Sequence, residues 1–192
     1  MFLHSPLGLT GAHRRELENL GRIRWVLLPS RFHTNYYEDY FQAFPEASFV
    51  GAPSVLQEFK VRPRNFVPLE TASEALSGQI DLIPIDGMPR VEEVVAFHRH
   101  SGSLLVADLV FNAAPAGDLY SKIMLRLAGM HGGVKASRLF RALISDRIAF
   151  SKSLRRVLEL PINRVLVAHG SFVEADARTV LKDAFKAVLT TE

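Results

Sequence analysis

Short apolar runs alternate with longer amphipathic stretches along this chain of 192 residues. The short runs are rich in leucine and β-branched residues and are bounded by glycine or proline, which is typical of strands. The longer stretches repeat apolar residues at helical spacing. This alternation indicates a mixed α/β domain, in which helices pack on the faces of sheets. We predict strands over 2–4, 23–28, 48–51, 65–68, 79–85, 93–98, 103–108 and 164–168, and helices over 11–20, 34–44, 54–59, 117–130, 136–147, 151–159 and 174–189.

Composition restricts the chemistry that the chain can carry. It is 48% hydrophobic and 22% charged, which is typical of a globular protein, and we expect a single domain over 1–192. The absence of cysteine excludes a disulfide scaffold, a cysteine zinc site, an iron–sulfur cluster and a thiol nucleophile, and it fits a reducing compartment. No apolar run approaches the roughly 20 residues of a membrane helix, and the first residues lack the pattern of a signal peptide. We therefore expect a cytoplasmic protein with no membrane partner.

Basic residues gather between positions 135 and 156, where seven lysines and arginines stand against one acid. This segment carries +6, whereas the remainder of the chain carries −3. Apolar residues recur through the segment at near-helical spacing, so the bases are expected on the wet side of amphipathic helices. The simpler interpretation is a solvated helix face, and the alternative is a surface that binds phosphate groups or RNA. We expect a helical basic insertion over 117–159 within the domain.

Three apolar runs lead into a polar residue that can bind a metal or move a proton. The run 25–28 leads through four further residues to His33, the run 104–107 leads to Asp108, and the run 165–168 leads to His169. All three residues are expected near the C-terminal ends of strands, where α/β proteins build their sites. Two imidazoles and one carboxylate form a facial ligand set for zinc, iron or manganese. Each residue also has an ordinary interpretation, as a hydrogen-bonded structural histidine or a turn-capping aspartate.

Other motifs with a known mechanism are missing. The sequence has no phosphate loop, no dinucleotide fingerprint and no nucleophile elbow, which argues against nucleotide-binding and serine-hydrolase functions. His98 and His100 lie close to a predicted hairpin turn at Ser101 and Gly102, and we interpret them as exposed turn residues.

The order of these segments resembles a divergent branch of the metallo-β-lactamase-like superfamily with an altered metal motif, over nearly the whole chain. The resemblance is carried by residues 4–6, 20–21, 29–33, 44–51, 87–89 with Glu93, 104–112 and 165–170. The last two segments are the most specific. They resemble the family's Gly-Asp-x-x-Phe segment, which holds the bridging aspartate, and its final His-Gly ligand.

The resemblance implies a four-layer αββα sandwich of two mixed sheets, with a metal site at one edge. Ordinary members use a His-x-His-x-Asp-His loop, a further histidine, the bridging aspartate and the last histidine to hold one or two zinc or iron ions. The ions generate hydroxide that attacks an ester, lactam, thioester or phosphodiester. Here the loop offers only His33, and Met88 occupies about the position of the fourth histidine. We therefore expect one divalent ion held by His33, Asp108 and His169, with Glu93 as a fourth ligand or general base.

Two functions follow from this resemblance. The first is a single-metal hydrolase of ester-like or phosphoester-like bonds in a small molecule. The second is a non-catalytic binding or scaffold protein without metal, in which Asp108 and His169 form a hydrogen-bond network and the basic helices contact phosphate-rich partners.

The start of the sequence differs from the family's pattern, because Met1 leads almost directly into an apolar strand whereas family domains carry strands before it. One sheet is therefore expected to lack an N-terminal edge strand. An uncovered edge favours pairing with a second copy, so a homodimer is a hypothesis that sedimentation tests.

Overall fold

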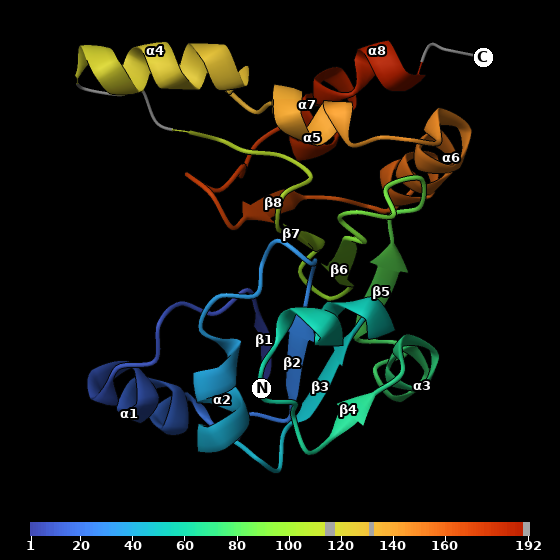
Figure 1. The fold of residues 1–192 in the computed structure, drawn as a ribbon. Helices are drawn as coiled ribbons and strands as arrows, with labels where there is room; N and C mark the ends of the chain where they lie inside the picture. Colours follow the sequence, from blue (N-terminus) through green and yellow to red (C-terminus); the bar gives the residue numbers. More distant parts are fainter. Residues whose placement is uncertain (114–117, 131–132, 190–192) are drawn as a thin grey trace.

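The computed structural model describes residues 1–113, 118–130 and 133–189, which fold into four layers (Figure 1). Sheet A contains β1 (Phe2–His4), β2 (Trp25–Leu28), β3 (Ser48–Gly51) and β4 (Phe66–Val67) in that order, and all its strand pairs are parallel. Sheet B contains β5 (Ile80–Pro84), β6 (Val94–His98), β7 (Ser103–Val106) and β8 (Arg164–Val167). In sheet B only the β7–β8 pair is parallel. The αββα sandwich expected from the sequence is therefore confirmed, although sheet A is parallel where a mixed sheet was expected.

Helices cover the outer faces of both sheets (Figure 1). On the side of sheet A lie α1 (Gly11–Leu20), α2 (Tyr37–Ala43) and the short 3₁₀ helix η1 (Pro53–Glu58), whereas α3 (Leu69–Ala75) packs through Ala72 with the residues between the two sheets. On the side of sheet B lie α4 (Leu119–Ala128), α5 (Arg138–Ala142), α6 (Arg147–Leu158), α7 (Ala177–Ala184) and α8 (Lys186–Leu189). The helices α4, α5 and α6 separate β7 from β8 in the chain, within the predicted insertion 117–159. Residue 117, where that insertion was expected to begin, lies outside the described residues.

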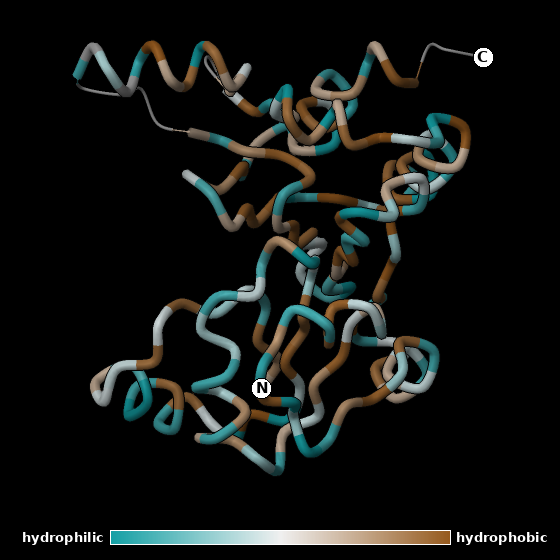
Figure 2. Tube along the Cα trace, in the orientation of Figure 1, coloured by the Kyte–Doolittle hydropathy of each residue, from teal (hydrophilic) through white to brown (hydrophobic). Residues whose placement is uncertain are grey.

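Alternation along the strands divides the core into three layers of packing. In β2, Val26 and Leu28 pack toward α2, whereas Leu27 packs between the sheets. In β6, Val95 and Phe97 pack toward the helices of sheet B, and their neighbours in the strand face the other way. This is the two-residue period of a strand that is buried on both faces. Figure 2 shows the resulting hydrophobic colouring of the strands and the mixed colouring of the outer helices.

The predicted strands are found at their expected positions, but three helical predictions need correction. The predicted helix 136–147 ends early, and α6 begins at Arg147 rather than at 151, because the Asp146 carboxylate accepts hydrogen bonds from the Ile148 and Ala149 amides. The predicted helix 174–189 is divided at Phe185 into α7 and α8. Helix α3 was not predicted.

The edges of the fold bear on the expectations about partners. Strand β1 lies at the edge of sheet A, and among the described residues no strand pairs with its other side. The edge of β1 is therefore unpaired within the described residues, whereas the homodimer stays a prediction. None of the helices within the described ranges is long and apolar enough to cross a membrane.

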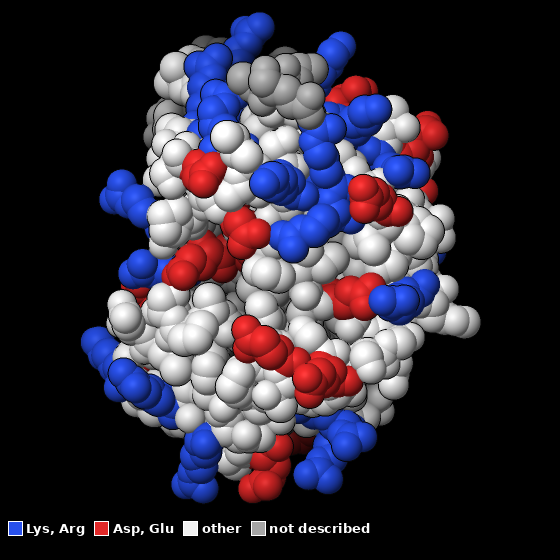
Figure 3. All heavy atoms as spheres, turned by 90° about the vertical axis from the view of Figure 1, so that its right-hand side faces the viewer, with Lys and Arg blue, Asp and Glu red and all other residues white. Residues whose placement is uncertain are grey.

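The basic segment 135–156 lies on α5, α6 and the turns beside them, and its lysines and arginines are exposed. Figure 3 shows lysine and arginine side chains gathered over the upper part of one face, the end of the molecule that carries the helices of sheet B, with acidic side chains among them. Arg156, for example, lies 2.9 Å from the Asp86 carboxylate. Binding of a phosphate-rich partner to this surface stays a prediction.

Candidate metal centre

The two sheets bring His33, Asp108 and His169 to the same end of the sandwich. Asp108 and His169 follow the neighbouring parallel strands β7 and β8, where Val106 is in register with Val167. Each is two residues beyond this matched pair, so their side chains lie at one edge of sheet B. His33 follows β2 of sheet A after a short turn. The three predicted ligands are therefore brought together from both sheets.

One atom of each side chain faces the others. His33 Nε2 lies 2.9 Å from His169 Nε2 and 3.3 Å from Asp108 Oδ1. His169 Nε2 lies 3.6 Å from the same Asp108 oxygen. No other group of three histidine and acidic side chains in the described part of the chain converges in this way.

The spacing of these atoms fits a single small cation. Ligand atoms bound at 2.0–2.1 Å around a tetrahedral ion lie about 3.3 Å from one another. The two distances to Asp108 are within a few tenths of an ångström of this value, and the two imidazole nitrogens need to separate by a similar amount. Two imidazoles and a carboxylate suit zinc, iron or manganese.

Neighbouring side chains orient His33. Its Nδ1 lies 2.6 Å from Ser5 Oγ. When the Nδ1–H group donates a hydrogen bond to this hydroxyl, the free lone pair of the ring is on Nε2, where the other ligands lie. Ser30 Oγ accepts hydrogen bonds from the Phe32 and His33 amides and donates one to Asp108 Oδ2 at 3.1 Å. The His33 turn is thus tied directly to the carboxylate of the second ligand.

His169 is held by an aromatic ring and by a tight turn. Phe111 stacks on its imidazole, with ring centroids 5.0 Å apart and an angle of 14° between the planes. The following Gly170 has φ +106°, and a Cβ at this position would lie 2.0 Å from the Asn112 carbonyl oxygen. Only glycine therefore allows the chain to turn directly behind His169.

Asp108 is buried and ionised. Burial alone raises the pKa of this carboxyl group, but hydrogen bonds from His169, His33 and Ser30 and the charge of His33 outweigh burial and hold the pKa well below its ordinary value. A carboxylate that stays negative is the form that binds a cation.

Glu93 and Met88 lie in buried surroundings. The Glu93 carboxylate accepts hydrogen bonds from the backbone amides of Ala107 and Asp108, at 2.9 and 3.2 Å. Burial and the charge of Asp108 raise the pKa of Glu93 to about 8, although backbone amides oppose this shift. Met88, which was expected at about the position of a histidine ligand, packs in the core between sheet B and its helices. It therefore offers no ligand atom to the centre.

His4 is a half-buried histidine at the same end of the sandwich. Its Nε2 is buried and has no hydrogen-bond partner, and burial, followed by the charge of His33, lowers the pKa of His4 to about 3. Below the ordinary pKa of 6.5 the unfolded chain binds a proton at His4 and the folded protein does not. His4 therefore reduces stability progressively as the pH falls from 6.5 toward 3.

We expect this linkage to be visible in urea unfolding with a chelator present. Between pH 7.5 and 5.5 the wild-type protein should lose about 1 kcal/mol more unfolding free energy than His4→Phe, which cannot titrate. The ligand histidines are common to both proteins, so the difference isolates His4. Equal pH dependence in the two proteins would contradict this account.

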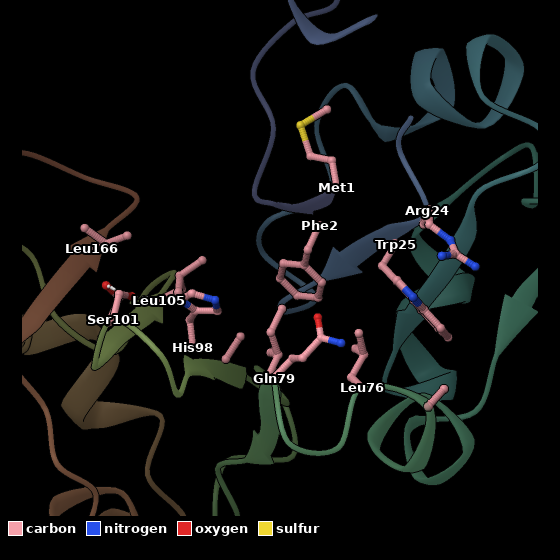
Figure 4. A pocket seen from close by; sticks show the side chains of 14 residues that line it. Met1, Phe2, Arg24, Trp25, Leu76, Gln79, His98, Ser101, Leu105 and Leu166 are labelled. Carbon is pink, nitrogen blue, oxygen red and sulfur yellow. Dashed lines mark hydrogen bonds between the residues drawn. The ribbon is translucent and has the colours of Figure 1, made fainter. Parts of the chain in front are cut away.

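A hollow of about 700 Å³ lies at the other end of the strands. Figure 4 shows Phe2, Trp25, Gln79 and His98 among the side chains that line it. Phe2 and Trp25 begin β1 and β2, whereas the candidate ligands follow the C-terminal ends of their strands. The hollow is therefore separate from the candidate metal centre.

The comparisons with known proteins agree with this fold. No protein-family model and no curated sequence matches the chain. Solved structures do match it. An archaeal metallo-β-lactamase superfamily protein from Sulfolobus tokodaii has a TM-score of 0.57 at 16% identity, covering 91% of this chain and 71% of its own. A metallo-β-lactamase from Pontibacter korlensis has a TM-score of 0.57 at 11% identity, covering 99% and 80%. The chain has the metallo-β-lactamase fold.

Proteins of other descriptions share this metallo-β-lactamase fold. The flavodiiron protein from Giardia intestinalis matches with a TM-score of 0.57 at 14% identity, covering 95% of this chain. The chain spans about half the length of that protein, 48%. At these identities the likeness establishes the fold alone.

Sequence reasoning did not identify three residues that shape the centre. Ser5, Ser30 and Phe111 orient the ligands, but each acts through a partner distant in sequence. A signal was present for Ser5, which directly follows β1 at the edge where the ligands lie. Phe111 stands at the phenylalanine of the Gly-Asp-x-x-Phe resemblance, whereas Ser30 gave no pattern that distinguishes it from an ordinary turn residue.

Proposed function

We propose that this protein is a single-metal hydrolase that cleaves an ester-like or phosphoester-like bond in a small substrate. The observation that carries the proposal is the convergence of His33 Nε2, His169 Nε2 and Asp108 Oδ1 on one point between the sheets. One ion is proposed rather than two, because the turn after β2 offers a single histidine and Met88 is buried in the core. The proposed location is the cytoplasm, with which a cysteine-free sequence is compatible.

Each residue has a defined task in this scheme. His33 and His169 would bind zinc, iron or manganese as neutral imidazoles through Nε2, and Asp108 would bind as an anion. When bound, such an ion makes hydroxide available near neutral pH and polarises an oxygen of the substrate. Ser5 keeps the His33 lone pair directed at the centre, and Phe111 fixes the plane of the His169 ring.

Elemental analysis tests the proposal directly. Protein purified without chelator is expected to contain close to one zinc, iron or manganese ion per chain, and to hydrolyse a nitrophenyl ester or a nitrophenyl phosphodiester. A chelator should abolish the hydrolysis, and the same ion should restore it. Protein that takes up no ion, even after incubation with each of the three metals, would contradict the proposal.

A second candidate is a scaffold protein without metal. It is supported by the 2.9 Å distance between His33 Nε2 and His169 Nε2, which is a hydrogen-bond distance and is shorter than the separation of two ligands on one ion. In this alternative the two imidazoles and Asp108 form a closed hydrogen-bond network. Elemental analysis distinguishes the two functions.

A further inference from the structure

The segment Val91–Val94 contacts the turns that carry two of the candidate ligands. The Arg31 amide donates to the Val91 carbonyl at 2.9 Å, and the Val94 amide donates to the Pro29 carbonyl at 2.7 Å. These two bonds enclose Ser30, whose hydroxyl accepts from the His33 amide. Since Pro29 follows β2 and Val94 begins β6, the bonds join sheet A to sheet B at the level of His33.

The Glu93 side chain extends the same segment to the second ligand turn. Its two carboxylate oxygens accept from the Ala107 and Asp108 amides, at 2.9 and 3.2 Å. Glu93, Ala107 and Asp108 are all buried, with at most 8% of each residue exposed. Without this carboxylate two buried amides beyond the end of β7 would lose these partners, which is costly away from water.

We propose that Glu93 is a positioning residue, which sets the place of Asp108 relative to His33 through the bridge formed by Val91–Val94. The inference rests on the proposed metal-binding function and assigns Glu93 a task other than general base or ligand. His33 follows β2 of sheet A and Asp108 follows β7 of sheet B, and among the described residues no strand of one sheet pairs with a strand of the other. A carboxylate with an amide on each oxygen fixes the direction of the Asp108 backbone, and hence of its side chain.

Zinc affinity, measured by competition with a chromophoric chelator, tests this role. Glu93→Gln places an amide NH₂ against one backbone N–H, and Glu93→Asp keeps the carboxyl group but is one methylene too short. Both variants should bind zinc at least about tenfold more weakly than wild type, the size of effect seen when groups behind metal ligands are removed. The visible absorption of bound Co²⁺ should change in both variants, because the ligand geometry changes.

Glu92→Gln is the matched control. This neighbouring carboxylate accepts from Ser54 Oγ rather than from the Asp108 turn, so the variant should bind zinc within about twofold of wild type. If Glu93→Gln binds zinc normally but loses hydrolysis, Glu93 is a base and the positioning role is wrong. If Glu93→Asp binds zinc normally while Glu93→Gln does not, the reach of the carboxyl group to the two amides does not matter, and the role is equally wrong.

Two further measurements keep the inference testable if these variants fold poorly or the wild type binds no metal. Ser30→Ala removes the hydroxyl that links the same turn to Asp108, and it should also weaken zinc binding; normal binding would contradict the bridge. Amide hydrogen exchange needs no metal, and the Ala107 and Asp108 amides should exchange faster in Glu93→Gln than in wild type. Wild-type protein without affinity for zinc, iron or manganese refutes the proposed function, whereas unchanged exchange refutes the bridge.

Discussion

Replacing His169 by alanine is expected to remove the bound ion while leaving the fold intact. The substitution takes away one of three ligand atoms. The two that remain, on His33 and Asp108, are too few to form a three-ligand facial metal site. We expect the metal content to fall from about one ion per chain to less than a tenth, and zinc affinity to fall roughly a hundredfold or more. Elemental analysis and chelator competition measure these quantities.

The fold should survive because the His169 side chain is about half exposed, at 47%. Its removal is expected to change the unfolding free energy of the metal-free protein by less than about 1 kcal/mol. The exposed His100 on the β6–β7 turn provides the control, since His100→Ala removes an imidazole outside the group and should keep the ion. Equal metal content in the two variants would show that His169 is not a ligand.

Replacing Gly170 by alanine is expected to damage both stability and metal binding. The residue has φ +106°, and the new Cβ would lie 2.0 Å from the Asn112 carbonyl oxygen. That oxygen accepts from the Ser171 amide, and the Asn112 amide donates to the His169 carbonyl. The collision must therefore displace the segment that carries His169. We expect a loss of roughly 2–4 kcal/mol in urea unfolding and at least about tenfold weaker zinc binding.

Gly78→Ala is the control that distinguishes the effect of the Cβ collision at Gly170 from the effect of a positive φ alone. Gly78 has φ +81°, and a Cβ there meets nothing within 4 Å. This control should cost about 1 kcal/mol and leave zinc affinity unchanged. If the two alanine variants lose the same stability, the close approach to Asn112 is not the cause.

Local sequence was sufficient to predict most elements, because strands buried on both faces and amphipathic helices leave clear periodicities. Helix α3 was not predicted because it is short, although Leu69, Ala72 and Leu76 follow Pro68 at helical spacing. The early start of α6 also had a visible signal, since Asp146 precedes it as a cap.

The three candidate ligands were predictable because each follows an apolar run, at the strand ends where sites form. Their surroundings were not, since a hydroxyl such as that of Ser30 acquires its task only when its turn meets the Asp108 turn. For the same reason no local pattern indicated that the Glu93 carboxyl group faces two backbone amides. Contacts of this kind depend on how the sheets are placed against each other, which no local pattern records.

Every strand of sheet A precedes every strand of sheet B in the chain, so the sandwich consists of two halves that are each continuous in sequence. The amino-terminal half supplies one imidazole of the candidate centre, and the carboxy-terminal half supplies the other imidazole and the carboxylate. Neither half holds a complete set. Binding of a cation therefore requires the two halves to be packed together. A change in how the halves pack would change the affinity for the cation.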